Sequence, residues 1–230
     1  MREMLSTSVF FGVFVSIVGY EIGLFLKKKF KLALFNPLLV AIVVVILLLV
    51  GTGVDYESYN EGAKYLSYLL TPATVCLAIP LYQQLAMLKR NYKAILGGIL
   101  AGVLTSILSV LGFCVLFNFD HQMYVTLLPK SITTAIGMGV SEELGGIVTV
   151  TVAVIIITGV FGNIIGEFVF KVFRIKEAVA KGVALGTSAH AIGTARAMEI
   201  GEVEGAMSSL AIAVAGLITV VGASIFANLY

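Results

Sequence analysis

The stretch Leu128-Pro129-Lys130-Ser131-Ile132-Thr133-Thr134 places a proline, a lysine and three hydroxyl side chains between strongly apolar segments. A lysine at membrane depth needs a partner or a water-filled cavity. Backbone that is interrupted at that depth must be buried in protein or line water. We therefore expect this stretch to form part of a binding site for a small anion, and the rest of the chain to be its scaffold.

The composition fixes the class of protein. The chain has 230 residues, of which 59% are hydrophobic and 12% are charged, whereas soluble domains carry about a quarter charged residues. The sequence predicts an all-α polytopic membrane protein that forms a single transmembrane domain over residues 1–230. Its surroundings are the lipid bilayer, and no nucleic acid is expected among its partners.

The apolar runs predict six to eight membrane segments. Five runs, at about 7–26, 37–53, 94–117, 147–170 and 206–229, are plain apolar helices. Three more are interrupted: 62–84 by Thr71-Pro72 and Pro80, 123–144 by Pro129-Lys130, and 177–199 by glycines, His190 and Arg196. Interrupted segments of this kind line cavities rather than face lipid.

The loop charges predict the orientation of these segments, because Lys and Arg concentrate on the cytoplasmic side. Basic clusters at 27–31, 89–93 and 171–181 are therefore placed in the cytoplasm, and acidic residues at 55–61 and 120 outside. The N-terminus is then outside. Segments 94–117 and 147–170 both have an end outside, so 123–144 is predicted to enter and leave from the same face as a re-entrant hairpin.

A re-entrant hairpin at 123–144 would also imply an internal repeat. The order helix, interrupted helix, helix occurs at 37–117 and again at 147–229, with opposite orientation if the hairpin is re-entrant. Inverted repeats of this type are common in secondary transporters, in which the substrate lies where discontinuous helices meet.

Polar residues in two interrupted segments are candidates for substrate binding. In 128–134, Lys130 supplies a positive charge, and Ser131, Thr133 and Thr134 supply hydroxyls beside a possible helix N-terminus. Alternatively, Lys130 extends to the membrane surface from a helix end. In 70–74, Thr71 and Thr74 flank Pro72, which frees backbone carbonyls; the alternative is a kinked helix whose threonines bond their own backbone.

The third interrupted segment adds three candidates. Arg196 can bind a substrate carboxylate through two parallel hydrogen bonds. Alternatively, it pairs with Glu199 or Glu202 at the outer surface. His190 can relay a proton near neutral pH or can be a neutral interior histidine, and Thr194 adds a hydroxyl. Asn163, deep in 147–170, is a further candidate.

No sequence motif indicates an enzyme or a metal site. The chain lacks G-x-S-x-G, P-loop and H-E-x-x-H patterns, and its two cysteines do not have metal-binding spacing. We therefore expect no catalytic residues, no metal and no cofactor.

Three motifs resemble the LrgB/CidB family of bacterial membrane proteins. They are Leu70-Thr71-Pro72-Ala73-Thr74-Val75-Cys76-Leu77-Ala78-Ile79-Pro80-Leu81-Tyr82, Pro129-Lys130-Ser131-Ile132-Thr133-Thr134 and Gly193-Thr194-Ala195-Arg196-Ala197. Many relatives have Pro after the paired threonines, whereas Ala135 stands there in this chain. The resemblance implies a fold akin to cation/proton antiporters and bile-acid transporters.

The resemblance also implies two functions. One is an antiholin-like role that modulates murein hydrolase export and autolysis with a small LrgA/CidA-type membrane partner. The other is transport of short carboxylates, such as pyruvate, or glycolate and glycerate in a plastid relative. The polar breaks favour secondary transport of small monocarboxylates, with possible coupling to H⁺ or Na⁺. The antiholin-like subunit is the alternative, and a homo-oligomer in the bacterial cytoplasmic membrane is expected.

Overall fold

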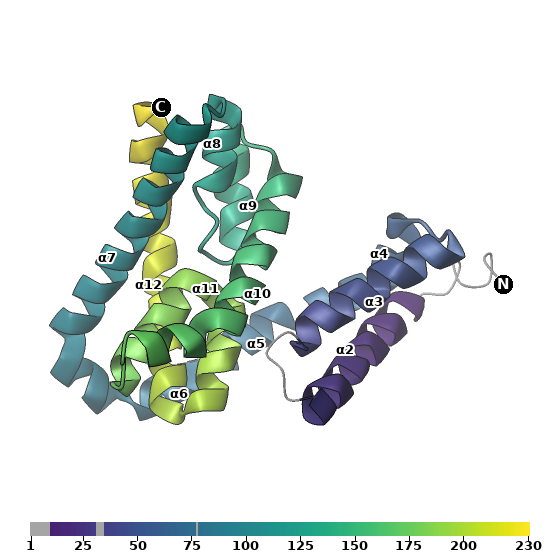
Figure 1. The fold of residues 1–230 in the computed structure, drawn as a ribbon, viewed down its shortest axis with the longest axis horizontal. Helices are drawn as coiled ribbons and strands as arrows, with labels where there is room; N and C mark the ends of the chain where they lie inside the picture. The colour runs from purple at the N-terminus through teal and green to yellow at the C-terminus, as the bar shows by residue number, and fades with distance from the viewer. Residues whose placement is uncertain (1–9, 31–34, 77) are drawn as a thin grey trace. The chain divides into compact units, whose positions relative to one another are not determined.

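The computed structural model describes the backbone of residues 10–30, 35–76 and 78–230 (Figure 1). The side chains of residues 70, 71, 74, 80 and 81 lie outside the described set, as do the predicted start of the first segment and part of the 27–31 lysine cluster. Every regular element in the described ranges is a helix. Three of them, α7 (Leu85–Phe117), α10 (Val148–Val172) and α12 (Glu202–Phe226), are long and apolar enough to cross a membrane. The prediction of an all-α polytopic membrane protein is confirmed.

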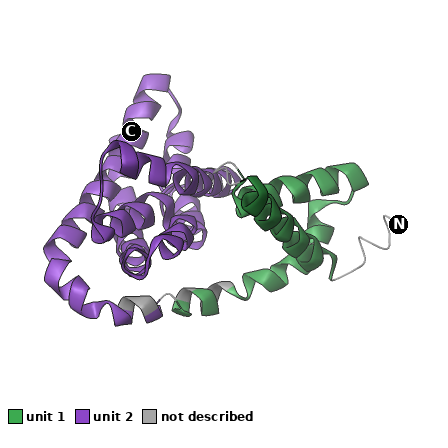
Figure 2. Cartoon of the chain, turned by 60° about the horizontal axis from the view of Figure 1, so that its bottom comes forward, with its two compact units in different colours: residues 1–76 green, residues 77–230 purple. Residues whose placement is uncertain are grey.

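The chain divides into two compact units, residues 1–76 and 77–230 (Figure 2). Each unit is described by itself. The prediction of a single transmembrane domain concerns how the units associate, and it stays a prediction.

The first unit is built on an antiparallel helix pair, α2 (Phe11–Phe30) and α3 (Pro37–Thr52). Glycines on α2 allow close approach, since a Cβ at Gly23 would lie 2.6 Å from the Cα of Pro37. Asn36 caps α3 by accepting from the N–H groups of Leu38 and Leu39 at 2.9 and 3.2 Å. The cap at Asn36 and the proline at the first helical position explain why the predicted segment 37–53 begins at Pro37.

Two predicted loops are helical in the structure. The acidic residues at 55–61 belong to α4 (Tyr56–Ser67), which Asp55 caps by accepting from the N–H of Ser58 at 3.0 Å. The basic residues at 89–93 lie in the first turns of α7. Lys, Arg and Glu are good helix formers, so these charged clusters do not mark the ends of helices. The interrupted segment 62–84 is divided among the end of α4, α5 (Leu70–Cys76) and α6 (Ala78–Gln83).

In the second unit, α8 (His121–Leu127) and α9 (Thr134–Glu143) form a hairpin that reverses at 128–133. Its α8 arm contacts the start of α10: the N–H of Ile147 donates to Thr126 Oγ1 at 2.8 Å, and Thr151 Oγ1 donates to the Thr126 carbonyl at 2.9 Å. Thr151 Oγ1 also lies 2.7 Å from Ser141 Oγ. Buried hydroxyls thus join both arms of the hairpin to the start of α10. Its side of the membrane stays a prediction.

Helix α11 (Ala178–Ile200) is also folded back on itself. Ala189 and His190 have non-helical dihedral angles, with φ of His190 at 41°. A Cβ at Gly193 would lie 2.4 Å from the carbonyl oxygen of Leu185, whereas eight residues of straight helix rise about 12 Å. The two arms, 178–188 and 191–200, are therefore antiparallel.

The two hairpins open at opposite ends of α12 (Figure 1). Near its start, α12 packs on both arms of α11, since a Cβ at Gly182 would meet the Glu204 carbonyl and one at Gly205 would meet Met198. Near its end, the Phe226 carbonyl accepts from Tyr124 Oη of α8 at 2.9 Å. The second unit thus has the order helix, hairpin, helix, hairpin, helix. The repeat boundaries 37–117 and 147–229 stay a prediction.

Candidate functional site

Lys130 lies at the reversal between α8 and α9, where Pro129 cannot donate a backbone hydrogen bond. Its Nζ donates to Ser106 Oγ of α7 and to Ser131 Oγ, both at 3.2 Å. The two serines share a hydrogen bond of 2.8 Å. One ammonium group and two hydroxyls therefore form a compact triangle between the hairpin and α7.

The charge of Lys130 has no counter-ion within the described parts of the chain, where no carboxylate lies within 4 Å of its Nζ. An ammonium group has three donors, and two of them are used by the serines. A half-buried cation without an acidic partner is costly unless a ligand or water supplies the missing charge and acceptor. Lys130 is thus suited to receive an anion.

A cavity of about 1070 Å³ reaches this triangle. Its walls are α7, α10, α11 and the 128–133 turn. Arg90 and Ser106 both line it, and the 16 positions between them on α7 correspond to about 24 Å of helix. The remaining turns of α7 beyond Ser109 do not line the cavity. The cavity therefore runs from the start of α7 and ends close to Lys130.

Two glycines of α7 bring α11 against the cavity wall. A Cβ at Gly98 would lie 3.3 Å from Val183, and one at Gly102 would lie 2.6 Å from Cγ2 of Thr187. Gly98, Gly102 and Ser106 are spaced four apart and share one helix face. The face that admits α11 is therefore continuous with the face that contacts Lys130.

Thr187 is an unsatisfied polar residue in this wall. It is 5% exposed and lines the cavity. Its Oγ1 is the one buried side-chain polar atom, among those described, that has no hydrogen-bond partner. A buried hydroxyl without a partner costs about 1–3 kcal/mol, so a hydrogen-bond partner for this hydroxyl would stabilise the protein. Thr187 faces Gly102, one turn from Ser106.

Among the residues proposed from sequence, Lys130 and Ser131 line the cavity. Thr133 is the N-cap of α9 without a side-chain capping bond, and Thr134 begins that helix; neither lines the cavity. Thr71 and Thr74 lie in α5, and their side chains are outside the described set.

Three other candidates hold the α11 hairpin together. His190 is buried and its Nε2 lies 2.9 Å from the Ile155 carbonyl. Thr194 Oγ1 donates to the His190 carbonyl at 3.0 Å and shares a 2.7 Å hydrogen bond with Ser208. Asn163 Nδ2 donates to the Ile192 carbonyl at 3.1 Å. These contacts are those of a structural support for the turn at 189–190.

Arg196 pairs with Glu167 of α10 and with Glu199. The Glu199 contact is one of the alternatives expected from sequence. The pairing with Glu167 places Arg196 at the end of α10 that carries Lys171, which the charge rule assigns to the cytoplasm rather than the outer surface. The fold-back of α11 is the reason for this difference.

Sequence reasoning missed Ser106 and Thr187 as site residues. The spacing of Gly98, Gly102 and Ser106 was a usable signal, because small residues four apart mark a close helix contact in membranes. Nothing in the sequence around Thr187 separates it from the neighbouring hydroxyl residue Ser188, which is exposed and bonds its own helix at the Ala184 carbonyl.

Comparison with known proteins identifies the family. The model of the LrgB-like family matches residues 16–229. Proteins named "Antiholin-like protein LrgB" from Bacillus cereus (strain B4264) and Bacillus anthracis (strain A0248) are each 41% identical over 213 residues, which cover 92% of this chain and 93% of the relative. No solved structure matches. Neither the family description nor these names state an enzymatic activity. The expected resemblance is thus confirmed, and this membrane protein belongs to the LrgB-like family.

Proposed function

We propose that this protein is a secondary transporter of small monocarboxylates, and that the carboxylate binds at Lys130. The observation that carries the proposal is the Lys130 cation, which lies at the end of a long cavity and has no counter-ion among the described residues. Ser106 and Ser131 add hydroxyls to the same spot, and Thr187 adds an unsatisfied one about one helical turn away.

The shape of the cavity supports transport over a closed binding pocket. It extends for about 24 Å along α7, which is most of the 30 Å or so of a hydrocarbon core. It ends at the turn of the α8–α9 hairpin, where Lys130 and Ser131 line it. A ligand at Lys130 would thus be open to one face and closed to the other, as alternating access requires. Coupling to H⁺ or Na⁺, a homo-oligomer and residence in the bacterial cytoplasmic membrane with the N-terminus outside are parts of this proposal.

The second candidate function is an antiholin-like membrane subunit that modulates murein hydrolase export and autolysis with a small LrgA/CidA-type partner. The names of the relatives favour it. It needs no anion site, and Lys130 would then serve only to join the hairpin to α7.

Proteoliposomes separate the two functions. The purified chain is reconstituted alone, and uptake of labelled pyruvate and glycolate is measured against protein-free liposomes, with and without gradients of H⁺ and Na⁺. Saturable uptake by the chain alone supports the carrier. Uptake at the protein-free level under every gradient would contradict it and would leave the antiholin-like role as the better account.

A further inference from the structure

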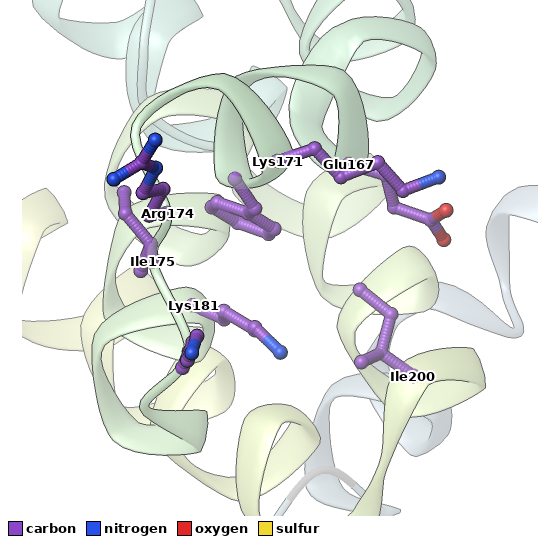
Figure 3. Close-up of a pocket in the computed structure, with 8 residues that line it drawn as sticks. Glu167, Lys171, Arg174, Ile175, Lys181 and Ile200 are labelled. Atoms are coloured by element: carbon purple, nitrogen blue, oxygen red, sulfur yellow. The ribbon is translucent and has the colours of Figure 1, made fainter.

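A second pocket, of about 400 Å³, lies at the connection between α10 and α11 (Figure 3). Its polar lining is mainly basic, and it comes from the end of α10, from the loop and from the first turn of α11. The basic residues are Lys171, Arg174, Lys176 and Lys181. In the view of Figure 3, Lys181 extends into the space between Ile175 and Ile200. The pocket therefore combines positive charge with an apolar wall.

The positive charge of this pocket is uncompensated. Its one acidic lining residue, Glu167, pairs with Arg196. Within the described ranges, none of the four basic side chains has a carboxylate within 4 Å. The first arm of α11 begins here too, and its N-cap residue Glu177 makes no side-chain capping bond. Free N–H groups at a helix start add to the attraction for an anion.

The position of the pocket indicates which class of anion it can bind. It adjoins the last turn of α10, a helix long enough to span the hydrocarbon core, so it lies at the depth of lipid headgroups. One side of the pocket is apolar and is formed by Phe170, Ile175 and Ile200. This side can contact the uncharged part of a ligand that carries an anionic group. Basic pockets at helix ends bind phosphate-bearing headgroups. No charged residue lines both this pocket and the Lys130 cavity.

We propose that the α10–α11 pocket is a binding site for a phosphate group, contributed by an anionic phospholipid headgroup or by a soluble phosphate. The site is distinct from the carboxylate site and does not depend on transport. Lys176 and Lys181 line the pocket from the α11 side, and Lys171 and Arg174 line it from the α10 side.

The test compares Lys176→Gln/Lys181→Gln with Lys89→Gln/Lys93→Gln in the full chain. Both double variants remove two positive charges, and Lys89 and Lys93 lie on α7 outside the pocket. Phosphatidylglycerol retention is measured by native mass spectrometry after titration in neutral detergent, and binding of inorganic phosphate is measured by calorimetry. Each basic residue beside anionic lipid contributes about fivefold in affinity. We expect a loss of about thirtyfold for Lys176→Gln/Lys181→Gln, or about 2 kcal/mol, and less than threefold for the control.

The two ligands distinguish the source of the phosphate. Loss of phosphatidylglycerol alone indicates a lipid site, and loss of inorganic phosphate binding indicates a site for soluble phosphate; either result supports the proposal. Equal losses in the two double variants would mean general charge attraction and would overturn it. So would the absence of wild-type binding to both ligands. Helical circular dichroism checks that both variants are folded, and Arg174→Gln provides an independent variant on the α10 side.

Discussion

Lys130 Nζ lies 3.2 Å from Ser106 Oγ, although 24 positions separate the two residues in the chain. This contact joins the reversal of the α8–α9 hairpin to the middle of α7. It places a positive charge at the end of the large cavity, where no carboxylate of the described residues lies within 4 Å to neutralise it. The following predictions concern that charge, the wall beside it and the two hairpins.

Thr187→Val tests whether the unsatisfied hydroxyl contacts substrate. Valine has nearly the same shape and removes a buried hydroxyl that lacks a partner, so the unliganded protein should be equally stable or more stable by about 1 kcal/mol. Loss of one hydrogen bond to substrate should weaken affinity by about tenfold. Thermal unfolding in detergent and the concentration dependence of uptake measure the two effects.

The matched control is Thr105→Val. Thr105 also lines the cavity, but its Oγ1 already donates to the Ala101 carbonyl at 2.7 Å. Its substitution should change substrate affinity by less than threefold. If both valine variants bind substrate as the wild type does, the hydroxyl of Thr187 is not a ligand contact.

Gly102→Ala should separate α7 from α11. The added methyl group would lie 2.6 Å from Cγ2 of Thr187, and overpacking of this kind costs about 1–3 kcal/mol. Gly97→Ala is the control, because a Cβ there meets nothing within 4 Å and alanine gains up to about 1 kcal/mol in helix propensity. Thermal unfolding should therefore shift in opposite directions. A shift in the same direction for both would argue against the close contact.

The break before Lys130 and the boundaries of segments 37–53 and 147–170 were predictable, because they follow from local signals. Pro129 marks a reversal, and Asn36 with Pro37 marks a helix start. The fold-back of α11 was not predictable in this way. Its turn is made by Ala189 and His190, with His190 at positive φ, although neither residue type marks a turn as Gly or Pro does.

The candidate site shows the same division. Lys130 and Ser131 stood out locally as polar residues in an apolar stretch, and both line the cavity. Ser106 and Thr187 belong to the site through packing of α7 against the hairpin and against α11. Arg196 looked equivalent to Lys130 by type, yet it has two acidic partners, and one of them comes from α10. These contacts join residues that are far apart in the sequence, so local sequence patterns could not predict them.

A cross-link between introduced cysteines tests the fold-back of α11. Glu167 and Arg196 form an ion pair, whereas a straight α11 would carry Arg196 about 27 Å from the start of the helix. With Cys76 and Cys114 replaced by serine, Glu167→Cys/Arg196→Cys should be cross-linked by a short bifunctional thiol reagent. The pair Glu167→Cys/Ser224→Cys should not, because Ser224 lies at the other end of α12. Equal cross-linking of both pairs, or of neither, would contradict the hairpin.

Thr151→Val should loosen the attachment of the α8–α9 hairpin to α10. The Thr151 hydroxyl contacts the Thr126 carbonyl and Ser141 Oγ in a buried site, and its loss leaves those groups unsatisfied at a cost of about 1–3 kcal/mol. Ser224→Ala removes an exposed hydroxyl that bonds its own helix at the Val220 carbonyl and should change stability by less than about 0.5 kcal/mol. Unfolding midpoints that do not differ would show that these bonds do not hold the hairpin.

The role of Lys130 is tested most directly by monocarboxylate uptake into proteoliposomes that contain Lys130→Gln. Glutamine keeps a polar side chain and removes the charge, and the matched variant Lys93→Gln removes an exposed charge from α7 outside the cavity. We expect Lys130→Gln to reduce saturable uptake to the level of protein-free liposomes, and Lys93→Gln to retain wild-type uptake. Wild-type uptake by Lys130→Gln would contradict the assignment of the carboxylate to Lys130.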